Sequence, residues 1–140
     1  MALLKFSFLI LLAFAFAGVA EELGSTHVEL IQRRGIPNAI FPVRQEKADL
    51  DDIVFVYEDS YYYIYNNRFY RAFFSKHYAS EIYQGLKIGS LKSELTALWG
   101  DKYALEKDGL VWQRSGHIIV AKISAENRLE SIWFIKEAAQ

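Results

Sequence analysis

The chain has 140 residues, with 16 Lys and Arg against 17 Asp and Glu, no Cys, and 16% aromatic residues. A chain of this length forms one compact domain or two very small ones. The near-neutral charge excludes general nucleic-acid binding, which depends on a basic surface. The lack of cysteine excludes disulfides, thiolate metal sites and a lipid-modified N-terminal Cys.

Residues 1–20 have the order of a secretory signal peptide: an early basic residue, an apolar run, and small residues before an acidic pair. Gly18 and Ala20 suit cleavage after Ala20, whereas Ala15 and Ala17 allow a cut after Ala17. A retained N-terminal anchor is the alternative, but the apolar run from 6 to 20 has 15 residues, and a spanning helix needs about 20.

We therefore predict a periplasmic or secreted protein, cleaved near Ala20 and without a stable membrane anchor after cleavage. Cleavage there removes Lys5 and no acidic residue, so the remaining 120 residues carry a net charge of −2. An exported chain without cysteine fits a bacterial envelope better than a eukaryotic secretory route, where small domains usually carry disulfides.

Two parts of the sequence resemble each other. Residues 23–35 and 88–100 share five of thirteen positions at a fixed offset, and segments 67–74 and 127–134 align in the same order further along. Self-similarity of this kind indicates an internal repeat. We predict a first helix-plus-sheet unit over 21–75, a linker over 76–87 and a second unit over 88–140.

In the first unit, Thr26 and Glu29 have capping-box spacing at the start of a short helix, and Gly35 ends that helix. A long loop follows over 36–52. Dense β-branched and aromatic residues then predict strands over 53–57, 60–65 and 68–74.

The second unit repeats this order. Ser90 is predicted to cap a helix that ends at Gly100. Strands are predicted over 110–114, 117–124 and 128–135. The fold class is therefore α+β: two tandem units, each a helix and a three-stranded antiparallel meander, with sheets that merge or lie side by side.

The second unit resembles the SmpA/OmlA (BamE-like) domain. The resemblance rests on residues 88–95, on Gly100 and Trp112, and on the apolar run 127–134. Two such units in tandem are similar to the beta-lactamase inhibitory protein superfamily, which implies a concave sheet that grips another protein. The chain lacks the lipid-bearing Cys of the first family and the disulfides of the second, so neither lipid anchoring nor lactamase inhibition carries over.

Eight of the nine tyrosines lie between Tyr57 and Tyr83. A two-residue turn at Asn66-Asn67 places Tyr65 opposite Arg68, Tyr63 opposite Tyr70 and Tyr61 opposite Ala72. The open face of the predicted hairpin then holds the candidate binding residues Tyr61, Tyr63, Tyr65, Arg68 and Tyr70. The same alternation puts Arg71 and Phe73 on the other face, which we expect to be the helix-covered core. Tyr and Arg are enriched at binding surfaces, although tyrosines also pack across strands for structural reasons alone.

No constellation for catalysis is visible. The three histidines are far apart in the sequence, and the acidic run 49–52 lacks the Gly and distal Glu of a calcium loop. No cysteine, nucleophile elbow or paired carboxylate suggests an enzyme, so we expect neither a metal nor any other cofactor.

The sequence favours an exported, non-catalytic module that holds a protein partner of the cell envelope on a tyrosine-rich sheet, in envelope assembly or inhibition. The alternative is a periplasmic protein that binds cell-wall glycan or peptidoglycan. The oligomeric state stays open.

Overall fold

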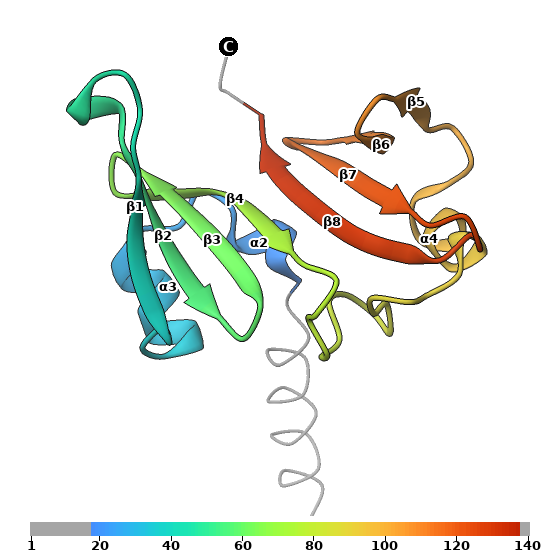
Figure 1. Cartoon of the computed structure of the whole chain (residues 1–140), viewed down its shortest axis with the longest axis horizontal. Coiled ribbons are helices and arrows are strands. Elements are labelled where there is room, and N and C mark those ends of the chain that lie inside the picture. Colours follow the sequence, from blue (N-terminus) through green and yellow to red (C-terminus); the bar gives the residue numbers. More distant parts are fainter. Residues whose placement is uncertain (1–17, 138–140) are drawn as a thin grey trace, which may run out of the picture.

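The computed structural model describes residues 18–137, so most of the predicted signal peptide, residues 1–17, lies outside the described part. Eight strands form a single antiparallel sheet in the order β1-β2-β3-β4-β8-β7-β6-β5 (Figure 1). Their bounds are β1 Ala39–Val43, β2 Asp52–Tyr57, β3 Ser60–Tyr65, β4 Arg68–Phe74, β5 Ala104–Glu106, β6 Gly109–Arg114, β7 His117–Ile123 and β8 Leu129–Lys136. Within residues 18–137, no helix is long and apolar enough to cross a membrane.

The prediction of two tandem units, each with a helix and a three-stranded meander, is wrong. Strand β4 pairs with β8 from Arg71↔Ile135 to Phe74↔Ile132, so both halves belong to one continuous sheet. Each half also has a fourth strand at the outer edge, β1 in one half and β5 in the other. Strand β1 lies in the segment predicted as a long loop, and Pro42 within it is tolerated because an edge strand needs fewer backbone donors.

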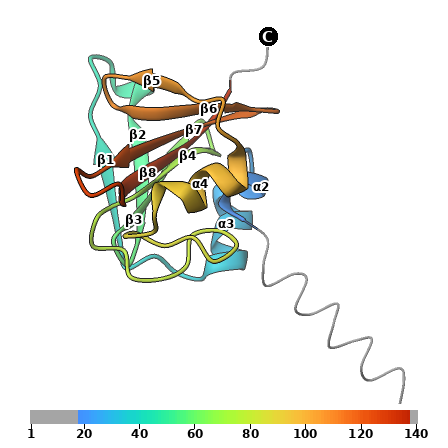
Figure 2. The same ribbon diagram turned by 90° about the vertical axis from the view of Figure 1, so that its right-hand side faces the viewer.

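Three short helices lie together on one face of the sheet (Figure 2). These are α2 (Val19–Glu22), α3 (His27–Arg34) and α4 (Lys92–Trp99), and a 3-10 turn, η1, spans Ala48–Leu50. Each helix inserts one almost fully buried side chain into the core: Val19, Leu30 and Leu95 respectively. The opposite face of the sheet carries none of these helices.

The first helix cap is confirmed, whereas the second differs from the prediction. Thr26 Oγ1 accepts from the Glu29 amide at 3.1 Å, and Glu29 Oε1 accepts from the Thr26 amide at 3.3 Å. In α4 the N-cap residue is Leu91, whose side chain has no acceptor, and Glu94 Oε2 alone reaches back to the Leu91 amide at 2.7 Å. Ser90 Oγ instead accepts from the Lys87 amide at 2.9 Å.

The segments that look alike in sequence form similar helix–strand junctions. The Gly24 and Phe69 amides donate to the carbonyls of Phe69 and Ser25, at 2.7 and 2.8 Å, which ties the start of α3 to β4. Around α4 and β8, Gly89 donates to Leu129 and Leu129 to Ser90, at 2.8 and 2.7 Å. The prediction of an internal repeat is nevertheless wrong, because the strands beyond these junctions build one eight-stranded sheet.

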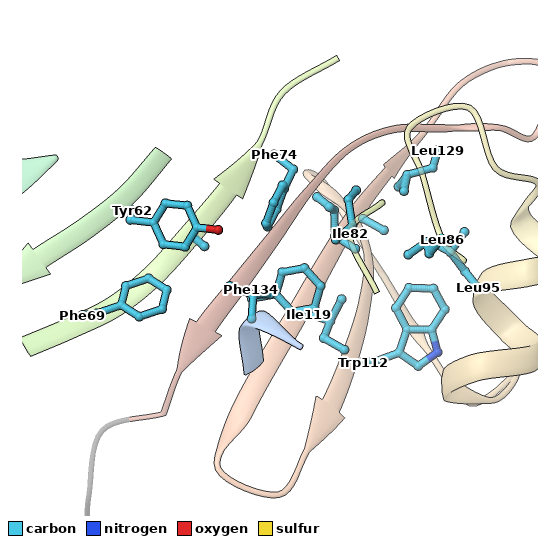
Figure 3. Close-up of a cluster of buried hydrophobic side chains, with 14 of the residues drawn as sticks. Tyr62, Phe69, Phe74, Ile82, Leu86, Leu95, Trp112, Ile119, Leu129 and Phe134 are labelled. Atoms are coloured by element: carbon cyan, nitrogen blue, oxygen red, sulfur yellow. The ribbon is translucent and has the colours of Figure 1, made fainter. Parts of the chain in front are cut away.

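One hydrophobic core spans both halves of the sheet (Figure 3). Tyr62 and Phe74 come from the first half, and Trp112 and Phe134 come from the second. The segment 76–87, predicted as a linker, contributes the buried side chains of Ile82 and Leu86 to this core. The polar edge of the Trp112 ring is satisfied by a hydrogen bond from Nε1 to the Gly100 carbonyl at 2.9 Å.

Candidate binding face of the sheet

The tyrosine-rich hairpin β3–β4 contains a bulge. Asn66 and Asn67 form the predicted turn with φ of 50° and 63°, and Tyr65 pairs with Arg68. Beyond Ile64↔Phe69 the register shifts, so that Tyr63 pairs with Arg71 and Tyr61 with Phe73. Tyr70 is the extra residue, and the predicted pairs of Tyr63 with Tyr70 and of Tyr61 with Ala72 are therefore wrong.

The bulge decides which side chains reach each face. Because side chains alternate along a strand, a shift of one residue exchanges the two faces. Ala72 and Phe74 turn into the helix-covered core. Arg71 and Phe73, predicted on the covered face, lie instead on the open face beside Tyr63 and Tyr61.

Five half-buried side chains from β3, β4 and β8 form what we call the aromatic face: Tyr61, Tyr63, Arg71, Phe73 and Trp133. The Phe73 and Trp133 rings stack with centroids 4.5 Å apart. Tyr61 lies 6.2 Å from Phe73, and Tyr63 lies 5.5 Å from Trp133. The rings thus make one continuous patch across three neighbouring strands.

Arg71 is the charged group within this patch. Its guanidinium carbon lies 4.2 Å from the centroid of the Tyr63 ring and 5.2 Å from that of Trp133. Such cation–π contacts fix the orientation of the guanidinium without using its N–H donors. An ion pair is present at Asp52, where Oδ2 lies 3.4 Å from Arg71 Nη2.

The Asp52 carboxylate is itself buried, and Tyr70 provides a hydrogen bond to it. The Tyr70 hydroxyl donates to Asp52 Oδ2 at 2.5 Å. Burial raises the pKa of Tyr70, and its hydrogen bond to the Asp52 carboxylate raises it further. Burial likewise raises the pKa of Tyr63, although the Arg71 charge opposes this shift. Tyr63 and Tyr70 therefore stay neutral hydrogen-bonding groups at physiological pH.

A shallow groove of about 350 Å³ adjoins the aromatic face. Arg71, Phe73 and Trp133 form part of its wall, and Lys122 of β7 and Asp108 of the β5–β6 turn add charges. The groove gives the open face a hollow in which a protruding side chain can be buried.

The predicted site residues are only partly brought together. Tyr61 and Tyr63 belong to the aromatic face, and Tyr70 supports it through Asp52. Tyr65 is 40% exposed near the hairpin turn. Arg68 reaches the start of α3, where its Nη1 donates to the Gly24 carbonyl at 3.2 Å.

Sequence reasoning missed Phe73, Arg71 and Trp133 as members of this face. Strict alternation puts Phe73 and Arg71 on the other face, because the bulge leaves no mark in the order of residue types. Trp133 comes 60 residues after Phe73 in the chain, and only the pairing of β4 with β8 brings it near.

Within the acidic run 49–52, Asp52 supports the aromatic face and Asp51 makes local contacts. Asp51 accepts from Arg44 Nη1 and from the Gln45 amide, at 2.5 and 2.8 Å. In the part of the chain that the structure describes, no three His, Asp or Glu side chains gather as a metal site.

Two solved structures are similar to this chain. An extracellular protein containing an SCP domain from Bacillus anthracis matches with a TM-score of 0.61 and 10% identity, over 87% of this chain and 46% of that protein. A cysteine-rich secretory protein from Staphylococcus aureus matches with a TM-score of 0.60 and 17% identity, over 86% and 45%. The chain thus spans less than half the length of each, and at these identities the likeness concerns the fold alone.

No protein-family model and no curated protein matches the sequence. The predicted resemblance to the SmpA/OmlA domain and to the beta-lactamase inhibitory protein superfamily is wrong, because the structural matches are to SCP-domain and cysteine-rich secretory proteins. The quoted motif consists mostly of Gly, Leu and aromatic positions. Any short helix that is docked on a strand needs such residues, so the motif carries little family information.

Proposed function

We propose that this chain is an exported, non-catalytic module that binds a protein partner on the aromatic face. Export is supported by the leader-like order of residues 1–20. Both structural neighbours are described as extracellular or secretory proteins, which agrees with that assignment.

The observation that carries the proposal is the continuity of the aromatic face. The rings of Tyr61, Phe73, Trp133 and Tyr63 follow one another at centroid distances of 4.5 to 6.2 Å, on the face of the sheet that points away from the core. Large aromatic groups that are already held in place lose little entropy on binding and bury a large area. A continuous patch suits a protein surface, whereas a glycan reader is expected to space its rings along a groove.

The charge on this face indicates the chemistry of the partner. Arg71 has five N–H donors, and its contact with Asp52 engages only one side of the guanidinium. Lys122 adds a second cation to the adjoining groove, where Asp108 also lies, and Glu130 Oε2 is 3.5 Å from Lys122 Nζ. We therefore expect the partner to present apolar or aromatic side chains next to a carboxylate that pairs with Arg71.

Site-specific photo-crosslinking in the producing cells tests the proposal. A benzophenone amino acid at position 61 is expected to yield one protein adduct of defined mass. The same group at Val28, which is 51% exposed on the helix-covered side, serves as the matched control and yields none. Equal adducts from both positions would contradict a binding role for the aromatic face.

Variants then distinguish an effect on partner binding at the aromatic face from an effect on folding. Tyr61→Ala with Trp133→Ala is expected to weaken capture of the crosslinked partner by at least tenfold, as hot-spot aromatics do, and Tyr65→Ala leaves capture unchanged. Arg71→Gln weakens it and Arg71→Lys restores part of it. The alternative is tested with purified peptidoglycan. If the chain sediments with it and the same variants abolish this co-sedimentation, the face binds glycan instead.

A further inference from the structure

We propose that the leader is removed after Ala17, so that the mature protein begins at Gly18. The sequence offers two cleavage sites, one with Ala15 and Ala17 and one with Gly18 and Ala20 at the small-residue positions. Both have small residues at the two positions that a signal peptidase reads. We choose between them by what the folded chain needs, because residues 18–20 have structural roles that a cut after Ala20 would remove. This inference does not depend on the proposed partner.

Val19 is part of the hydrophobic core. Its side chain is 1% exposed and belongs to the cluster that includes Phe134 and Trp112, and Ala20 packs against the same cluster. A chain that begins at Glu21 lacks both residues. Because surrounding side chains relax only partly around a deleted apolar group, the loss leaves a void and lowers stability.

Gly18 is also fitted to its surroundings. A Cβ atom at this position would lie 2.5 Å from Cδ2 and 2.7 Å from Cε2 of Tyr83, so Gly18 lies directly against that ring. Its carbonyl accepts from the Glu21 amide at 3.2 Å, in the first turn of α2. A cut after Ala20 removes this contact and this turn together.

The same cut affects a buried ion pair. Glu22 is 6% exposed, and its Oε2 lies 2.8 Å from Arg34 Nε. Cleavage after Ala20 makes Glu22 the second residue of the chain, next to a new charged amino group and without the preceding turn. Cleavage after Ala17 keeps Glu22 inside α2, which holds the carboxylate against Arg34.

The intact mass of the exported protein tests the inference. The full chain, with its own leader, is expressed in a bacterium and recovered from the periplasm or medium. The expected mass corresponds to residues 18–140. A mass corresponding to residues 21–140, or to the uncleaved chain, overturns the inference.

Two leader variants provide the matched control. Ala17→Phe places a bulky group just before the proposed cut, so the leader is retained or the cut moves. Ala20→Gln lies beyond the proposed cut and is expected to give the same N-terminus at Gly18. If Ala20→Gln blocks or moves cleavage and Ala17→Phe does not, the cut lies after Ala20 and the inference fails.

Discussion

The hydroxyl of Tyr62 is a polar group buried without compensation. Tyr62 is 0% exposed, and its OH has no hydrogen-bond partner within residues 18–137. Its ring is well used, since it packs 5.1 Å from Phe69 and under the Arg34 guanidinium at 4.8 Å. The Tyr62 ring therefore stabilises the fold through its packing, whereas burial of the unpaired hydroxyl oxygen lowers the stability.

We predict that Tyr62→Phe leaves the free energy of unfolding unchanged or raises it by about 1 kcal/mol, because it removes only the unpaired hydroxyl. Tyr62→Ala, which deletes the ring, is expected to lower it by about 3–5 kcal/mol. Urea denaturation of both variants measures the difference. A destabilised Tyr62→Phe protein would mean that the hydroxyl is paired after all.

The same residue predicts a pH dependence. Burial raises the pKa of Tyr62 above its ordinary value of 10.0. Above pH 10 the unfolded chain releases a proton that the folded chain keeps, so the free energy of unfolding falls as pH rises, by about 1.4 kcal/mol per pH unit for one such group. Denaturation between pH 9 and 11.5 is expected to show a shallower fall for Tyr62→Phe, and identical slopes would refute the assignment.

At the scale of elements, turns and helix caps could be predicted from the sequence, whereas the strand register could not. The Asn66-Asn67 turn and the Thr26 cap depend only on neighbouring residues, so both could be predicted from the sequence. The position of the bulge at Tyr70 depends on how the side chains pack on both faces of the sheet. Residues 69–74 are apolar or aromatic at most positions, so alternation does not say which of them turns toward the helices.

The two helix starts give a matched pair of variants. Thr26→Ala removes the oxygen that satisfies the Glu29 amide in the first turn of α3, and we expect a loss of about 1 kcal/mol in the free energy of unfolding. Ser90→Ala removes an exposed contact to Lys87 outside α4, which water replaces, and should cost less than about 0.5 kcal/mol. Thermal melts compare the two, and an equal or larger effect at Ser90 would assign it the capping role.

At the scale of the molecule, the pairing of β4 with β8 was the feature that sequence could not supply. The two strands are separated by more than 50 residues, and both carry apolar residues on both faces. Nothing local indicates that the last strand of one meander will pair with the last strand of the other. That one pairing turns two expected units into one sheet and brings Trp133 to Phe73, so the error in fold class and the omission in the site have the same cause.

This architecture predicts a single unfolding transition. Phe134 packs against Phe74 of the first half and Trp99 of the second, with centroids 6.0 and 6.1 Å apart, so the halves share a core. All three tryptophans lie in the second half and eight of nine tyrosines lie in or before the segment 76–87. Tryptophan fluorescence and tyrosine absorbance therefore report on different halves, and we expect their melting curves to coincide, as two-state unfolding requires.

The variant Phe134→Ala sharpens this test. It is expected to lower the free energy of unfolding by about 3–5 kcal/mol, and both probes should move together because the deleted ring contacts both halves. Thr26→Ala, at the start of α3 in the first half, should also move both curves by one common amount. Separate midpoints for the two probes, in the parent protein or in either variant, would show that the halves unfold independently in spite of their common sheet.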